Sequence, residues 1–144
     1  MNKTLPNKYI RKAIIDALNG LEVNGYSIPV YDTRVPSMDT PNHYIIISTQ
    51  VNNVLKQNIC EDFWESNTTL DIVTSYSKPG NPGSRLLCND ITDEVLFLLD
   101  DFTMPVESDL KVLFQTISTP NELYLETESE NIYRCLMQIS LELS

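Results

Sequence analysis

The sequence predicts an α+β fold, in which an antiparallel sheet has an N-terminal helix and a second helix packed on one face. Three observations predict it. Apolar residues recur at helical spacing in two separate segments, they alternate with polar residues in several others, and the two helical segments stand apart from the runs of strands. The expected order is one helix, four strands, one helix and two strands, forming a single domain over residues 1–144.

The first helix is predicted over residues 7–19. Asn7 follows Leu5-Pro6 and is expected to be its N-cap, and Gly20 is expected to end it at the C′ position. One apolar stripe follows the spacing of a helix that packs on a core, and it consists of Ile10, Ala13, Ile14, Ala17 and Leu18.

A hairpin is predicted next, because Asn24-Gly25 is a favoured pair for a type I′ turn. Its second strand continues to residue 31, and Pro29 places that strand at an edge of the sheet. Residues 32–42 are expected to form a loop. Strands follow over residues 43–51 and 68–77, and the second has Trp64, Leu70, Ile72 and Tyr76 on one alternating face.

The segment between those strands, residues 52–68, is too long for a tight turn and is expected to extend both strands into a protruding β-arm. It contains more apolar side chains than a free loop would have, which suggests a contact between subunits. Leu55, Ile59 and Phe63 are the candidate interface residues, whereas Trp64 is expected to belong to the core.

The second half begins with a loop rich in Gly and Pro at residues 78–83, after which Ser84 is expected to cap a helix that runs to about Asp101. A strand over residues 110–118 is expected to be broken by Pro120. The last predicted strand, residues 132–143, has on one face Tyr133, Cys135, Met137, Ile139, Leu141 and Leu143.

The sequence does not indicate catalysis. His43 is the single histidine, and the cysteines Cys60, Cys88 and Cys135 form no C-x-x-C pair. We expect three reduced thiols, no catalytic, metal-ligating or cofactor-binding residues, and no cofactor. No apolar run approaches the roughly 20 residues of a membrane span, and the N-terminus has no apolar core of a secretory signal, so no membrane partner is expected.

Charge is unevenly divided along the chain. Residues 1–60 have a net charge of +2 and residues 61–144 a net charge of −12. Such a surface repels phosphate, which disfavours tight binding of nucleic acid but suits a channel through which DNA slides. Glu126, Glu128 and Glu130 alternate, so an extended chain would project them to one side as a candidate acidic lumen surface. The other interpretation is a solvated rim that serves solubility.

The arrangement of elements resembles the tail-terminator (tail-completion) family of tailed bacteriophages and related head–tail connector proteins. The segments that give this resemblance are, in order, a helix at 9–18 (YIRKAIIDAL), a strand ending at 29–32 (PVYD), prolines at 36 and 41, strands at 44–48 (YIIIS) and 69–74 (TLDIVT), a helix ending at 95–99 (VLFLL), and closing strands at 110–118 and 132–143. The arm at 52–68 and the acidic segment at 121–131 are additions to this pattern.

The resemblance implies a structural subunit of a virion, assembled in the host cytoplasm and forming a homo-oligomeric ring. Its partners would be further copies of itself and neighbouring neck, portal-side or tail proteins, and DNA would pass nearby without specific binding. A neck ring of a short-tailed phage is an equal possibility. Two other hypotheses remain: a monomeric protein-binding adaptor of phage or bacterial origin and, ranked last, a small enzyme that uses a cysteine and His43.

Overall fold

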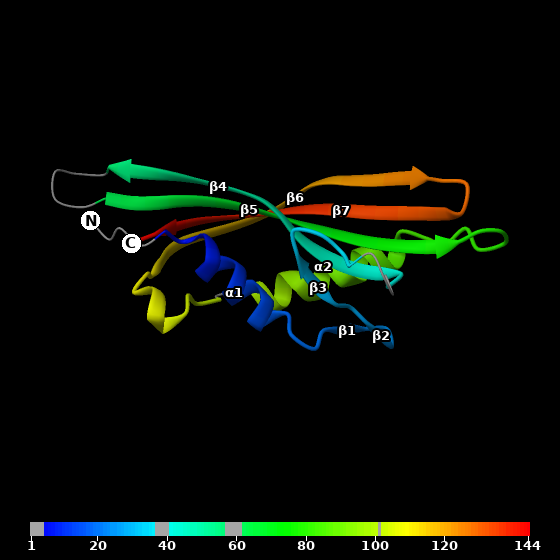
Figure 1. Ribbon diagram of the computed structural model, residues 1–144, viewed down its shortest axis with the longest axis horizontal. Helices are drawn as coiled ribbons and strands as arrows, with labels where there is room; N and C mark the ends of the chain where they lie inside the picture. Colours follow the sequence, from blue (N-terminus) through cyan, green and yellow to red (C-terminus); the bar gives the residue numbers. More distant parts are fainter. Residues whose placement is uncertain (1–4, 37–40, 57–61, 101) are drawn as a thin grey trace.

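The computed structural model describes residues 5–36, 41–56, 62–100 and 102–144. It confirms the α+β class: a five-stranded sheet in the order β3-β4-β5-β7-β6 carries both helices on one face (Figure 1). The strands are β3 (Val30–Asp32), β4 (His43–Lys56), β5 (Asp62–Ser77), β6 (Val112–Glu126) and β7 (Glu130–Leu143).

Three of the four contacts between neighbouring strands are antiparallel, and the short β3 pairs with β4 in parallel. The sheet is therefore mixed at one edge, where an entirely antiparallel sheet was predicted. β3 follows Pro29, whose carbonyl accepts a 2.9 Å hydrogen bond from the Ile45 amide. The single strand expected up to residue 31 is divided in two: Tyr26–Ser27 pairs with Glu22–Val23 in a separate two-stranded sheet, and Val30–Asp32 alone joins the main sheet, at its edge. Five strands therefore precede the second helix, where four were expected.

The long strands extend further than alternation in the sequence indicated. β4 and β5 are paired as far as Lys56 and Asp62, and β5 remains paired with β7 as far as Trp64. Most of the predicted arm thus belongs to the sheet, and only its end reaches past β7. The expectation that Pro120 breaks the next strand is wrong, because β6 continues to Glu126 after a register shift between Ser118 and Asn121.

The two helices are α1 (Asn7–Ala17) and α2 (Leu86–Leu99), and a short 3₁₀ helix, η1 (Val106–Ser108), follows them. All three predicted caps are displaced by one residue: Leu18 is the C-cap of α1, so Gly20, with a φ of 74°, lies one position beyond C′, and each N-cap is a neighbour of the predicted residue. Pro6 is the N-cap of α1, and the Asn7 side chain instead accepts a hydrogen bond from the Asn52 amide. Arg85 is the N-cap of α2, and the Ser84 hydroxyl accepts a 3.4 Å hydrogen bond from the Leu86 amide.

The predicted turn between β1 (Glu22–Val23) and β2 (Tyr26–Ser27) is confirmed. Asn24 and Gly25 have φ angles of 52° and 83°, the left-handed values that a type I′ turn requires at both central positions.

The core lies between the sheet and the helices. Alternate residues of the central strands face α1 and α2, and the fully buried side chains there include Ile45, Ile47, Leu70, Ile72, Met137 and Ile139. The helices contribute Ile10, Ile14, Ile91 and Leu99. Because burial is confined to this face, the strand register decides which residues form the core and which form the opposite face.

We predict that Ile72→Ala destabilises the fold by about 2–5 kcal/mol, because the truncation leaves a cavity where Ile72 is fully buried. Ile15→Ala is the matched control: its side chain is partly exposed on α1, so the change should cost no more than about 0.5 kcal/mol. Urea unfolding followed by circular dichroism measures both values. Equal losses in the two variants would contradict the assignment of the core face.

Candidate assembly surfaces

The sheet face turned away from the helices has no covering layer in the described part of the chain (Figure 1). Strand register places on it the residues that alternate with the core: Tyr44, Ile46, Val51, Asn53, Phe63, Glu65, Asn67, Thr69, Asp71, Val73, Ser75, Ser77, Phe114, Thr116, Ser118, Asn121, Leu123, Leu125, Glu130, Ile132, Arg134, Leu136, Gln138, Ser140 and Glu142. We call this set the open face. Apolar and aromatic residues gather toward its middle and the β6–β7 hairpin, and amide, hydroxyl and acidic groups toward the β4–β5 end.

One charged pair interrupts the apolar part of the open face. Arg134 donates two hydrogen bonds to Asp71, at 3.2 Å from Nε and 2.5 Å from Nη2, and the Asp71 side chain is only 9% exposed. This hydrogen bonding raises the pKa of Arg134 above its ordinary value. The guanidinium is therefore neutralised locally by a bidentate partner.

The three glutamates of the predicted acidic surface lie at the hairpin that joins β6 and β7. Glu126 ends β6, Glu130 begins β7, and Glu128 lies in the turn between them, so the expected single strand face is wrong. Glu126 also forms a 2.5 Å ion pair with Lys78. The cluster is an exposed hairpin tip, and whether it faces a lumen stays a prediction.

The candidate interface residues of the arm lie at the opposite end of the sheet. Phe63 is half-buried and pairs with Leu55 across β4 and β5, while Ile59 falls outside the described residues. Trp64 packs partly buried against the core, as expected. The pairing of Leu55 with Phe63 brings two of the three candidates together, and their part in an interface stays a prediction.

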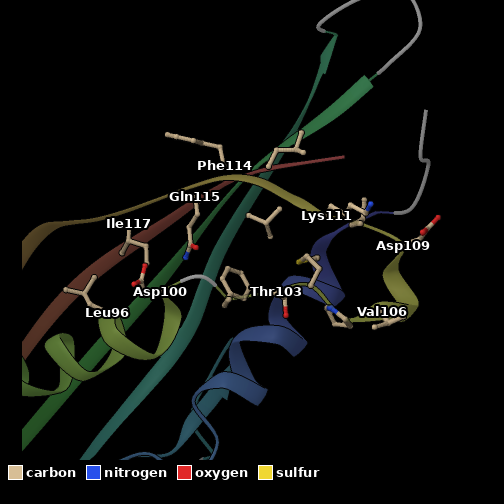
Figure 2. Close-up of a pocket in the computed structure, with 15 residues that line it drawn as sticks. Leu96, Asp100, Thr103, Val106, Asp109, Lys111, Phe114, Gln115 and Ile117 are labelled. Atoms are coloured by element: carbon tan, nitrogen blue, oxygen red, sulfur yellow. The ribbon is translucent and has the colours of Figure 1, made fainter.

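A groove of about 900 Å³ runs beside β6, between the end of α2 and the segment 102–111 (Figure 2). Gln115 and Ile117 point into it, and the Gln115 amide donates a 2.7 Å hydrogen bond to the Leu99 carbonyl. Phe114 projects to the other side of the strand and is 61% exposed. Val106, at 94% exposure, adds a second uncovered apolar side chain to this end of the molecule.

His43 is embedded in a row of aromatic rings. Its ring lies 4.9 Å from that of Tyr26 and 5.5 Å from that of Tyr76, and burial lowers the pKa of the imidazole. Among the described residues no group of His, Cys, Asp and Glu is arranged to hold a metal ion. No helix within the described ranges is long and apolar enough to cross a membrane.

The two described cysteines, Cys88 and Cys135, are buried, unbonded thiols, and Cys60 lies outside the described residues. Burial raises the pKa of Cys88 to about 12 and raises that of Cys135. A thiol that stays protonated is a poor nucleophile, so neither position suits covalent catalysis.

Comparison with known proteins gives a structural match without a sequence family. No family model matches the chain, and no curated protein matches it. The fold is similar to a chain of a solved structure described as the virion of a native gene transfer agent (GTA) particle, with a TM-score of 0.64 and 12% identity over 94% of this chain and 96% of that chain. At this identity the match demonstrates a shared fold.

Two features of these surfaces were not anticipated from the sequence. The groove arises from the segment 102–111, whose path no local pattern predicts. The exposure of Leu113 and Phe114 was not predicted, because a strand with apolar residues on both faces is typical of one that is buried on both sides. The signal available was the position of this strand at a sheet edge, which depends on long-range pairing.

We predict that Cys88 reacts with a thiol reagent at pH 8 about 10³-fold more slowly in the folded protein than in the unfolded chain. A pKa near 12, against the ordinary value of 9.0, lowers the thiolate fraction by that factor. A Cys60→Ser, Cys135→Ala background isolates the site, and absorbance of the released thiolate follows the reaction. Rapid labelling of the folded variant would contradict the environment described for Cys88.

Proposed function

We propose that this protein is a structural subunit of a bacteriophage-like virion, in which several copies form a neck or tail ring around the path of DNA. The open face of the sheet lines that path, and the helices lie on the outer side. The role is to join other virion proteins, with no chemical turnover and no cofactor.

The charge of the open face is the observation that carries this proposal. Within β4, β5, β6 and β7, strand register places a single Arg or Lys on this face, Arg134, and Asp71 holds it in an ion pair. Glu65 and Glu142 lie beside each other on neighbouring strands toward the β4–β5 end, and Glu130 lies near the other end. A surface of this kind has no unpaired cationic side chain on its strands to contact the phosphates, so DNA moves along it without binding.

The fold supports the same role. The similar solved chain belongs to a structure described as a virion particle, and the similarity extends over nearly the whole of both chains. Large apolar side chains are exposed on several elements, among them Phe97, Val106, Phe114 and Val51, and assembly of copies into a ring would cover those at the sheet edges.

The second candidate function is a monomeric adaptor that binds one partner protein. The groove beside β6 favours it, because a concave surface with apolar residues suits a single peptide segment or loop. The two functions differ in oligomeric state, which is the quickest property to measure.

We predict that the purified protein forms a homo-oligomer of defined subunit number, alone or on addition of its neighbouring virion proteins. Light scattering coupled to size-exclusion chromatography gives the mass, and native mass spectrometry gives the subunit number. A mass of 16.4 kDa whenever the protein is measured alone, and a one-to-one complex when a partner protein is added, would support the adaptor instead.

We also predict that lysines placed on the open face make the ring retain DNA. Thr69 and Gln138 are directly paired there, so Thr69→Lys with Gln138→Lys adds two neighbouring positive charges. Asp93→Lys on the exposed side of α2 changes the net charge by the same amount and is the control. Duplex DNA should bind the double variant at least tenfold more tightly than the control, most strongly at low salt. Equal binding by both variants would place the open face away from the DNA path.

A further inference from the structure

We infer that neighbouring copies join edge to edge: the outer side of β4 over residues 50–55 pairs with the outer side of β6 over residues 112–118 of the next copy. The inference rests on the proposed ring and specifies its joint. It makes the sheets of successive subunits continuous at one end.

The first argument is that neither segment has a proline, a charged residue or a further described strand to guard its edge. Among the described residues, α1 reaches Gln50 and Asn52 of β4 only through the side chains of Arg11 and Asn7. Proteins usually guard an edge strand with proline, with charge or with a covering element. The first half of β4 is covered by β3 at residues 45–47, and the second half of β6 contains Pro120, Glu122 and Glu126. Residues 50–55 and 112–118 contain no charge and no proline, and no further strand pairs with their outer side in the described part of the chain.

The second argument is that the two unguarded edge segments lie at the same end of the sheet and in the same rows of paired residues. Val51 pairs with Asn67, Asn67 with Ser140, and Ser140 with Thr116. Val51 and Thr116 are therefore at opposite edges of one row that crosses four strands. A copy placed beside the first without a shift along the strands brings the two residues together.

Strand direction agrees with this joint. Each of the three contacts from β4 through β5 and β7 to β6 is antiparallel, so β4 and β6 run in opposite directions. When the next copy is placed side by side in the same orientation, its β6 is antiparallel to the first copy's β4. The contact is heterologous, because two different edges meet. Repeated contacts of this type form a ring when the rotation between successive copies closes, as the proposed function requires.

The backbone hydrogen-bonding groups are also in phase. The Ser75 amide donates to the Asn42 carbonyl, so the odd-numbered residues of β5 direct their backbone N–H and C=O groups toward β4. Asn67 is one of them, and the backbone groups of its partner Val51 therefore point toward β5, away from the outer edge. Lys111 and Ser144 exchange two 3.1 Å hydrogen bonds, and by the same alternation β7 holds Thr116 inward. The residues left turned outward are Gln50 and Asn52 on one edge and Gln115 and Ile117 on the other, in matching rows.

The side chains near the joint fit the same arrangement. Val51 is 56% exposed, and Thr116 is exposed on the same open face. In the neighbouring row, Asn53 and Phe114 are both exposed and come together in the same way. Pairing would cover Phe114 and bring Val54 of one copy beside Val112 of the next, at the mouth of the groove.

Disulfide trapping tests the joint. Val51 and Thr116 would form a non-hydrogen-bonded antiparallel pair, with Cα atoms about 4.5 Å apart, within the range of roughly 4.4–6.8 Å that a disulfide spans. Val51→Cys with Thr116→Cys, in a Cys60→Ser background, should form a ladder of covalent oligomers on mild oxidation, ending at the subunit number of the ring. Reduction should return the monomer on denaturing gels.

Two single variants are the matched controls. Val51→Cys alone and Thr116→Cys alone should stay monomeric on denaturing gels, because a heterologous joint brings two different edges together. Efficient covalent dimers from one single variant would show a symmetric contact of two identical edges and overturn the inference. Pairing Val51→Cys with Phe114→Cys or Ser118→Cys tests a stagger of two residues, the smallest shift that keeps each face in place.

The outcomes separate this joint from the ring itself. A ring of defined mass that gives no ladder with any of the three cysteine pairs refutes the edge joint and leaves the proposed function standing. A protein that is monomeric in all conditions refutes both. A ladder that ends at a fixed number, equal to the mass measured without oxidation, supports both.

Discussion

The pairing of β5 with β7 is the constraint on which the rest of the structure depends. Every residue of β7, from Glu130 to Leu143, has a partner on β5 without a shift in register. This unbroken ladder fixes which side chains point to the helices and which to the open face, because a slip of one residue would exchange the two sets. The three irregularities of the sheet lie in the contacts of β4 and β6, outside this central pair.

Much of this arrangement was accessible from the sequence because it depends on local patterns. The alternating face of the last strand, the Asn24-Gly25 turn, the core position of Trp64 and the edge role of Pro29 were all predicted from residue type and spacing. The predictions that are wrong concern positions whose structure depends on segments distant in the sequence. Asn7 is drawn from the cap of α1 to Asn52, and Pro120 is tolerated inside β6 because the strand is an edge with a bulge.

The candidate surfaces also combine features that local sequence predicts with features that depend on contacts between distant segments. Composition and charge predicted a protein without catalytic groups and with an acidic second half, but the sequence placed the acidic surface on one strand face. In the structure, Glu126 and Glu130 are on opposite sides of a hairpin turn, and Lys78 pairs with Glu126. The open face acquires its character from residues far apart along the chain, such as Asp71 and Arg134, whose ion pair needs the β5–β7 register.

The bulge between Ser118 and Asn121 has a mechanical consequence. It divides β6 into a first half with an unguarded outer edge and a second half that contains Pro120, Glu122 and Glu126. The proposed joint therefore fixes one end of each sheet and leaves the end with the β6–β7 hairpin unattached. A bulge also bends and twists a strand locally. The sheet of each subunit would then be joined to its neighbours at one end only, and its other end could tilt toward or away from the axis of the ring. The bore at that end would widen or narrow while the bonds between subunits stay intact.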